Sequence, residues 1–482
     1  MKATPRPHPL CAILATVAAA GIAHGAAPEI QPIPDQTTPE STPLVVQLSV
    51  TDADSPVGGL AFQARSDHPI ILPDSSFEFQ VGGGMARLRI TPRPGQPSPV
   101  EVVVFVGDGA EIVETSFTLT ISPAPGTDLR AVPTDPGFYQ REIVDQGLLR
   151  KYLINVPRNY DPQRRTPLAL VCHGSGQTAR SFATRNPSVA FEAEEAGYIV
   201  VYPEATFNPE QGKTSWTTNP GAETRPHEDV LFIANLVSAV KSALSVDPDR
   251  VYGSGFSGGG VLTHNVAIEH PCLYAAIAPV AASIGWQDRS LPPDPARPAE
   301  ESLIFSDHPA QGTPVMMIRG RRDEKRPFDG GYNSAGTAIA SAATSTEFWR
   351  TANGCQGSAS RTILPGGTGS IHTYDQCDDD LEVNLVELSL MFHSWPEADN
   401  AAGFDGSDAI FNFFDRFTRC AVPAITIGNA ADGTRQITWQ GTLQSSDDLT
   451  NWSDLDPQPA QPLVITPTPG SKACFFRSRS DR

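Results

Sequence analysis

The sequence is poor in several features that mark particular classes of protein. Lysine and arginine number 35 against 54 aspartates and glutamates, which gives a formal net charge of -19. Recognition of a nucleic-acid backbone needs clustered basic side chains, so this balance argues against a nucleic-acid-binding protein. The chain has no CxxC motif and no Cys/His cluster with the spacing of zinc ligands. We therefore expect no metal and no other cofactor.

Long apolar runs are also missing. The apolar, small-residue stretch from Leu10 to Ala23 is too short to span a bilayer. It follows Lys2 and Arg6 and leads into a sequence that suits cleavage after Gly25. The pattern predicts a secretory signal peptide over residues 1–25, no membrane span, and a protein that is extracellular or periplasmic.

Cysteine is scarce, with seven residues, of which Cys11 lies in the predicted signal peptide. In an oxidising compartment some of the others will pair. Cys355 and Cys377 bracket one loop-rich stretch and are the preferred pair. Cys172 and Cys272 either pair or remain as buried thiols.

The length of 482 residues exceeds what one compact core usually holds. Residues 26–124 show little helical periodicity and predict strands over 44–50, 86–90, 102–106 and 117–121. This pattern resembles the cadherin-like or Ig-like β-sandwiches of bacterial extracellular proteins. Asp52 and Asp54 are either calcium ligands or ordinary turn aspartates.

Residues 125–420 have a different pattern, in which predicted strands over 152–157, 168–172 and 198–202 alternate with helices. The clearest helix spans 229–244 with Asp229 as its N-cap, and the last spans 409–417. Alternation of this kind predicts an α/β domain with a mostly parallel sheet covered on both faces. Residues 421–482 return to short strands and predict a small β-rich module.

The motif Gly255-Phe256-Ser257-Gly258-Gly259 lies between a predicted strand and a predicted helix. This is the context of the nucleophile elbow of α/β-hydrolases, in which a sharp turn exposes the serine oxygen above the sheet. The amide of Gly258 would then lie at a helix N-terminus and donate to a developing oxyanion. Ser257 is the predicted nucleophile, with a glycine-rich structural turn as the alternative.

The other catalytic groups should follow in the order acid, then histidine. A buried strand over 314–320 leads to Asp323, the preferred acid, with Glu324 and Asp329 as competitors. His393 follows the strand-like segment 383–388 and precedes the last helix, a placement that His264, His270, His308 and His372 lack. His393 is therefore the predicted general base.

The second oxyanion donor of this fold comes from the loop after an early central strand. That loop is His173-Gly174-Ser175-Gly176-Gln177, and the amide of Ser175 is the preferred donor. His173 precedes the nucleophile in the chain, so we interpret it as a structural residue beneath the loop. Trp216 and Trp395 are candidate substrate-binding residues.

Several ordered motifs resemble the secreted polyhydroxybutyrate depolymerase and feruloyl or acetylxylan esterase-like family. The resemblance covers roughly Gly147 to Phe417 and rests on segments 167–177, 247–259, 269–281, 320–331 and 393–396. It implies that the matching Ser257, Asp323 and His393 form the triad and that Cys355 and Cys377 form a disulfide. The chain departs from the family at Met391-Phe392, where glycines are usual, and at Arg319, where histidine is frequent. Arg321 and Arg322 follow and form either a solvated face or a site that attracts an acidic polymer.

These observations predict a secreted serine carboxylic-ester hydrolase that acts through an acyl-enzyme. The expected substrate is polymeric, with feruloyl or acetyl esters of plant cell-wall polysaccharide preferred and a polyhydroxybutyrate polyester as the alternative. A peptidase of the same fold is a further alternative. An alternative of another class is an inactive hydrolase-like binding or adhesion protein, which predicts a defective site.

Overall fold

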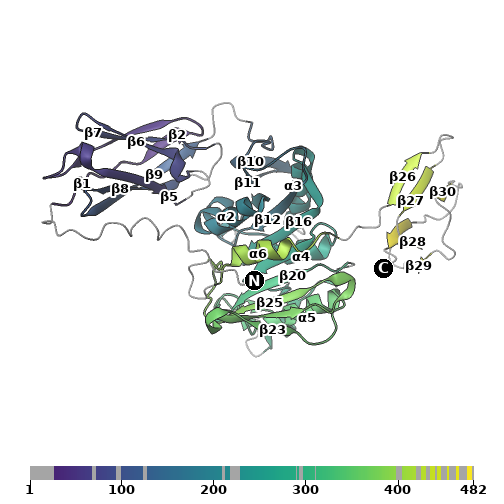
Figure 1. Ribbon diagram of the computed structural model, residues 1–482. Helices are drawn as coiled ribbons and strands as arrows, with labels where there is room; N and C mark the ends of the chain where they lie inside the picture. Colours follow the sequence, from purple (N-terminus) through teal and green to yellow (C-terminus); the bar gives the residue numbers. More distant parts are fainter. Residues whose placement is uncertain are drawn as a thin grey trace, which may run out of the picture.

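The computed structural model describes most of the chain between residues 26 and 419 (Figure 1). Within that range it leaves out 68–71, 94–98, 123–127, 209–211, 218–227, 289, 292–296, 310 and 398–403, and beyond residue 419 it describes only strand backbones. The predicted signal peptide, Cys420 and Cys474 lie outside the described residues. Among the residues described, no helix combines the length and the apolar character needed to cross a membrane.

The first part of the chain forms two facing sheets. One has the strand order β2-β9-β8-β5 and the other β3-β7-β6, and a short pair β1-β4 accompanies them. In β8 the side chains of Val100, Val102, Val104 and Val106 are buried between the sheets, which is the period-two pattern of a sandwich. The four strands expected from the sequence are present here, while kinship with cadherin or Ig modules stays a prediction. The strands are β1 (Glu29–Ile30), β2 (Gln36–Pro39), β3 (Leu44–Leu48), β4 (Val50–Thr51), β5 (Ala61–Ser66), β6 (Phe77–Gly82), β7 (Met85–Ile90), β8 (Val100–Gly107) and β9 (Ile112–Ser122).

The central part is built on a ten-stranded sheet of order β10-β11-β13-β12-β16-β17-β20-β25-β24-β23. The six strands from β13 to β25 run parallel, and the antiparallel strands lie at the two edges. The strands are β10 (Gly137–Asp145), β11 (Leu148–Val156), β12 (Thr166–Cys172), β13 (Ile199–Pro203), β16 (Val246–Phe256), β17 (Ala276–Val280), β20 (Val315–Gly320), β23 (Ser360–Ile363), β24 (Gly369–Tyr374) and β25 (Val383–Leu388). His372, one of the histidines set aside in favour of His393, lies on β24.

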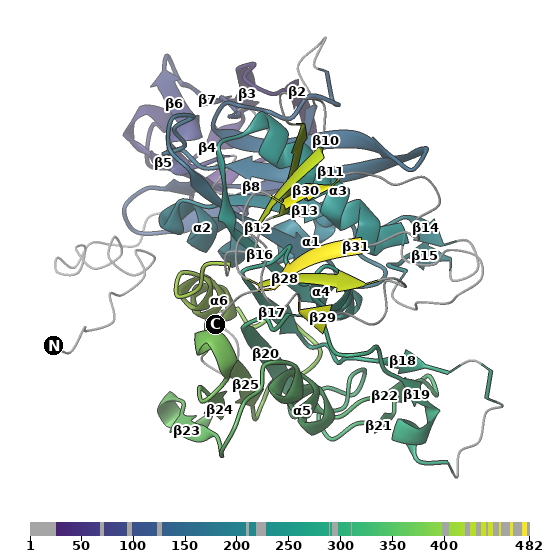
Figure 2. The same ribbon diagram turned by 90° about the vertical axis from the view of Figure 1, so that its right-hand side faces the viewer.

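Helices cover both faces of this sheet, as Figure 2 shows from the side. The side chains of β12 divide between two cores: Ala169 and Val171 face α1, α2 and α6, while Leu168 and Leu170 face α3 and α4. The helices are α1 (Ala179–Arg185), α2 (Pro187–Ala196), α3 (Glu228–Ala243), α4 (Gly258–Glu269), α5 (Ala342–Ala352) and α6 (Gly406–Phe414). This is the α/β-hydrolase fold, as the sequence predicts.

Two helix starts differ from expectation. Asp229 does not cap α3 but lies inside its first turn, because its carboxylate binds Arg150 at 2.6 Å in a fully buried ion pair. The last helix begins at Gly406 and ends at Phe414, earlier than the predicted 409–417, because the side chain of Asp405 accepts the amide of Asp408.

The loops of the hydrolase part contain short pairs of antiparallel strands. They are β14 (Phe207–Asn208) with β15 (Lys213–Thr214), β18 (Trp286–Gln287) with β19 (Leu303–Ile304), and β21 (Gly331–Tyr332) with β22 (Ala338–Ile339). After residue 419 two three-stranded sheets have the orders β26-β27-β30 and β29-β28-β31. Their strands are β26 (Ile425–Asn429), β27 (Arg435–Trp439), β28 (Thr442–Ser446), β29 (Ser453–Asp454), β30 (Leu463–Ile465) and β31 (Phe475–Arg479).

Candidate active site

Ser257 occupies the sharp turn between β16 and α4. Its backbone has φ 54° and ψ -116°, a conformation that few non-glycine residues adopt. The turn is held because the amide of Ser257 donates to the carbonyl of Val280 at 2.9 Å. A Cβ atom on Gly259 would collide with the carbonyl oxygens of Cys172 and His173, so the close approach of α4 to β12 requires glycine there.

Ser257, His393 and Asp323 come together at the carboxyl ends of β16, β25 and β20. The Oγ of Ser257 lies 2.8 Å from Nε2 of His393, and Nδ1 of His393 lies 2.7 Å from Oδ2 of Asp323. The His393 side chain is 11% exposed and that of Asp323 is fully buried. This arrangement allows the imidazole to take a proton from the serine while the carboxylate fixes its tautomer.

The loop that carries Asp323 is fastened on both sides. The Oδ1 atom of Asp323 accepts hydrogen bonds from the amides of Lys325 at 2.9 Å and Arg326 at 2.8 Å. Its Oδ2 atom is thereby left to bind His393. The amide of Arg322 donates to the carbonyl of Met391 at 3.0 Å, so the acid loop and the histidine loop run side by side. The competing acids do not reach His393: Glu324 is exposed, and Asp329 is 84% exposed and pairs with Arg321.

Arg319 is buried behind this loop, where its guanidinium donates to carbonyl groups. Its donors reach Ala282 at 2.9 Å and Pro327 at 3.0 Å, and burial lowers its pKa to about 10. The arginine therefore ties β20 to the segment that follows β17 and to the far end of the acid loop. The sequence marked this position as unusual without indicating that structural role.

The proposed oxyanion loop follows β12 and lies against the N-terminus of α4. The amide of Gly174 donates to Oε1 of Gln177. The amide of Gly176 donates to the carbonyl of Thr214, and that of Gln177 donates to the carbonyl of Gly174. Within the described part of the chain the amide of Ser175 has no such acceptor. A Cβ atom on Gly258 would meet Ser175, so the two predicted donors are neighbours.

His173 is fully buried, and its imidazole makes two hydrogen bonds that hold this loop. Its Nε2 accepts the amide of Ala205 at 3.0 Å, so the proton is on Nδ1, which lies 2.8 Å from the carbonyl of Gly174. Burial lowers the pKa of His173 to about 4, and the ring is neutral at physiological pH. The predicted structural role fits this geometry.

Trp216 and Trp395, the candidate substrate-binding residues, are both almost fully buried. Trp216 is 5% exposed and its indole donates to the carbonyl of His173 at 2.6 Å. Trp395 is 6% exposed and donates to Ser407 at 3.0 Å, with its ring against Phe182. Contact with substrate stays a prediction for both, while the contacts seen here position the loops on which Ser175 and His393 lie.

The variant Trp216→Phe distinguishes substrate binding by Trp216 from positioning of the loop that carries Ser175. Loss of the indole N–H should loosen the His173 carbonyl and the loop after it, and misplacement of catalytic groups by ~1 Å can cost up to about 100-fold. We expect kcat to fall roughly 10-fold with KM unchanged, measured on p-nitrophenyl acetate. A rise in KM at constant kcat would instead indicate direct substrate contact.

A second buried histidine, His264 on α4, makes the fold sensitive to acid. Trp349 donates to its Nδ1 at 3.0 Å, and burial, with the charges of Arg319 and Arg326, lowers the pKa of His264 to about 3. Unfolded histidine has a pKa of about 6.5, so below that pH the unfolded chain binds more protons than the folded chain. The free energy of unfolding should fall as the pH drops, and His173 adds to the effect.

Each of these two histidines should cost roughly 2 kcal/mol of stability between pH 7 and pH 5. Urea unfolding at both pH values measures the loss, and His264→Gln, whose amide oxygen can still accept from Trp349, should remove about half of the contribution of the pair. An unchanged pH dependence in that variant would show that His264 is not the group that titrates.

The predicted disulfide between Cys355 and Cys377 is present. Cys172 is a buried thiol in β12, and Cys272 donates to Gln311 at 2.9 Å.

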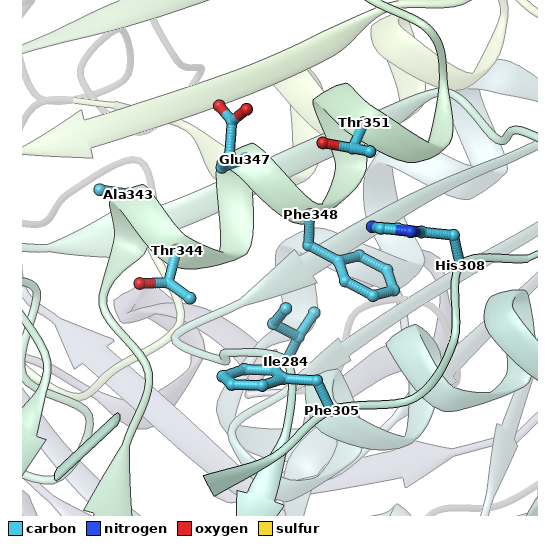
Figure 3. A pocket seen from close by; sticks show the side chains of 8 residues that line it. All are labelled: Ile284, Phe305, His308, Ala343, Thr344, Glu347, Phe348 and Thr351. Carbon is cyan, nitrogen blue, oxygen red and sulfur yellow. The ribbon is translucent and has the colours of Figure 1, made fainter. Parts of the chain in front are cut away.

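A hollow of about 560 Å³ lies beside α5 and is lined by Phe305, Phe348 and Ile284 (Figure 3). It contains no member of the triad, and we assign it no part in the chemistry.

The hydrolase part of the chain is similar to known proteins. Residues 151–286 match the family model described as Esterase PHB depolymerase. A putative esterase of Nocardia uniformis subsp. tsuyamanensis, NocK, is 30% identical over 276 residues, which covers 53% of this chain and 73% of NocK. The chain belongs to the PHB depolymerase esterase family. It is thus a carboxylic ester hydrolase.

Two further relatives of this esterase are matched over smaller parts of their own length. Feruloyl esterase B of Piromyces equi is 25% identical over 261 residues, with 53% of this chain and 44% of that protein covered. Poly(3-hydroxyalkanoate) depolymerase C of Paucimonas lemoignei is 32% identical over 115 residues, 24% of this chain and 27% of that protein. The esterase therefore spans less than half the length of either relative.

Proposed function

We propose that this esterase is secreted and hydrolyses feruloyl or acetyl esters on plant cell-wall polysaccharide, through an acyl-enzyme on Ser257. The observation that carries the proposal is the chain of contacts from Ser257 Oγ through His393 to Asp323, at 2.8 and 2.7 Å. The name of the feruloyl esterase relative supports the substrate class. The predicted export supports a polymeric substrate outside the cell.

The proposed reaction has two halves. Ser257 Oγ bonds to the ester carbonyl carbon while His393 Nε2 takes the serine proton, and the amides of Ser175 and Gly258 hold the oxyanion. Collapse breaks the bond to the alcohol oxygen, which leaves with the proton from His393. Water then attacks the acyl-enzyme with His393 as base, and the acid product and free serine are released.

The second candidate is hydrolysis of a hydroxyalkanoate polyester, which the depolymerase relative favours. A panel of p-nitrophenyl acetate, methyl ferulate, acetylated xylan and polyhydroxybutyrate film distinguishes the two, and a p-nitroanilide peptide tests the peptidase alternative. A burst of p-nitrophenol equal to the enzyme concentration would indicate the acyl-enzyme. Activity on the film alone would overturn the polysaccharide proposal, and a folded protein silent on every substrate would favour the binding-protein alternative.

A further inference from the structure

Two residues that immediately precede triad members lie together at the surface. Arg322 precedes Asp323, and Phe392 precedes His393. The guanidinium carbon of Arg322 lies 5.7 Å from the centre of the Phe392 ring, within the range of a cation–π contact. Phe392 is 57% exposed, so its ring presents an apolar face to the solvent next to the guanidinium.

Arg322 and its neighbour Arg321 differ in their ion pairs. In the described part of the chain the guanidinium of Arg322 has no carboxylate partner. Its neighbour Arg321 has two, since it binds Glu387 at 2.7 Å and Asp329 at 3.0 Å. Arg322 is also exposed, so its guanidinium is accessible to a ligand beside the proposed triad.

The position of Arg322 is fixed by the same contacts that assemble the triad. Its amide donates to the Met391 carbonyl, and the next residue, Asp323, is held by two amides and by His393. The guanidinium is therefore carried on a backbone that cannot move independently of the catalytic groups. A planar guanidinium binds carboxylates in a fixed geometry, which suits recognition of a substrate rather than general attraction.

We propose that Arg322 and Phe392 form a carboxylate-recognition site at the rim of the active site, so that the enzyme prefers esters whose substrate bears a carboxylate near the scissile bond. The inference rests on the proposed triad. Phe392 offers an apolar face to the body of the substrate, and Arg322 binds the acid group. The carboxylate comes either from a uronic acid substituent of a glycan or from the free acid end of a hydroxyalkanoate oligomer.

Two substrate pairs test the proposal and separate the sources. The first is an acetylated glucuronoxylan oligosaccharide and the same compound with its carboxyl group reduced to the alcohol. The second is the 3-hydroxybutyrate dimer and its primary amide. We expect the wild type to have about 10-fold higher kcat/KM for the charged member of one pair, because a charge-assisted hydrogen bond is gained. A preference in either pair supports the site and identifies the source.

Arg322→Gln should abolish this preference, mainly by raising KM, and added salt should weaken it in the wild type. The adjacent Arg321→Gln is the matched control and should keep the preference. All three proteins should hydrolyse p-nitrophenyl acetate at similar rates, which separates failure of this site from failure of the proposed triad. The proposal is overturned if the wild type shows no preference in either pair, or if Arg322→Gln retains the preference of the wild type.

Discussion

Ser257→Ala should lower kcat on p-nitrophenyl acetate by roughly 10⁵-fold, with KM little changed. The variant removes the oxygen that lies 2.8 Å from His393 Nε2, and without it no acyl-enzyme can form. The small remaining rate would come from the oxyanion amides and from binding. Steady-state kinetics and the loss of the p-nitrophenol burst measure the effect.

Ser254→Ala is the matched control for this prediction. Ser254 lies three residues earlier, on β16, and its hydroxyl donates to the carbonyl of Ala278 at 2.6 Å. That variant should lose about 1 kcal/mol of stability and keep its activity within a few-fold of the wild type. If Ser257→Ala keeps more than about a hundredth of the wild-type kcat, another residue is the nucleophile.

Asp323→Asn should lower kcat by about 10⁴-fold without unfolding the protein. The amide oxygen of asparagine would still accept the amides of Lys325 and Arg326, which turns the NH₂ group toward His393. His393 Nδ1 would then have to accept instead of donate, and the proton would move to Nε2, where it blocks removal of the serine proton. Circular dichroism checks the fold, and kcat reports the tautomer.

Asp329→Asn provides the control, because the sequence offers that residue as a competing acid. Its side chain is largely exposed and binds Arg321, so the substitution should change kcat less than about twofold. A large loss in Asp329→Asn with a small one in Asp323→Asn would reverse the assignment of the acid.

Local patterns in the sequence predicted the main features of the hydrolase part. The motif around Ser257, the buried strand before Asp323 and the strand before His393 each combine a chemical group with its secondary structure. The structure brings these three side chains into contact, although they come from distant parts of the chain. The order of motifs along the chain was sufficient because the parallel strands all end at the same edge of the sheet.

Features that depend on distant partners were not predictable in the same way. The N-cap assigned to Asp229 was wrong because its partner, Arg150, lies 79 residues earlier, on β11. The bonding of Trp216 to His173 and of Arg319 to backbone carbonyls likewise joins segments whose proximity only the fold creates. The resemblance to the family marked Arg319 as unusual, but only the geometry shows which contacts these residues make.

Because the residues of the proposed triad follow three separate strands, their positions also determine when the enzyme can become active during its synthesis. Ser257 and His393 are 136 residues apart, and His393 follows the last parallel strand of the sheet. A nascent chain that has produced the elbow and the acid loop still lacks its base until β25 pairs with β20. Because contacts of such long sequence separation form late, ester hydrolysis should begin only after nearly the whole hydrolase domain has been made.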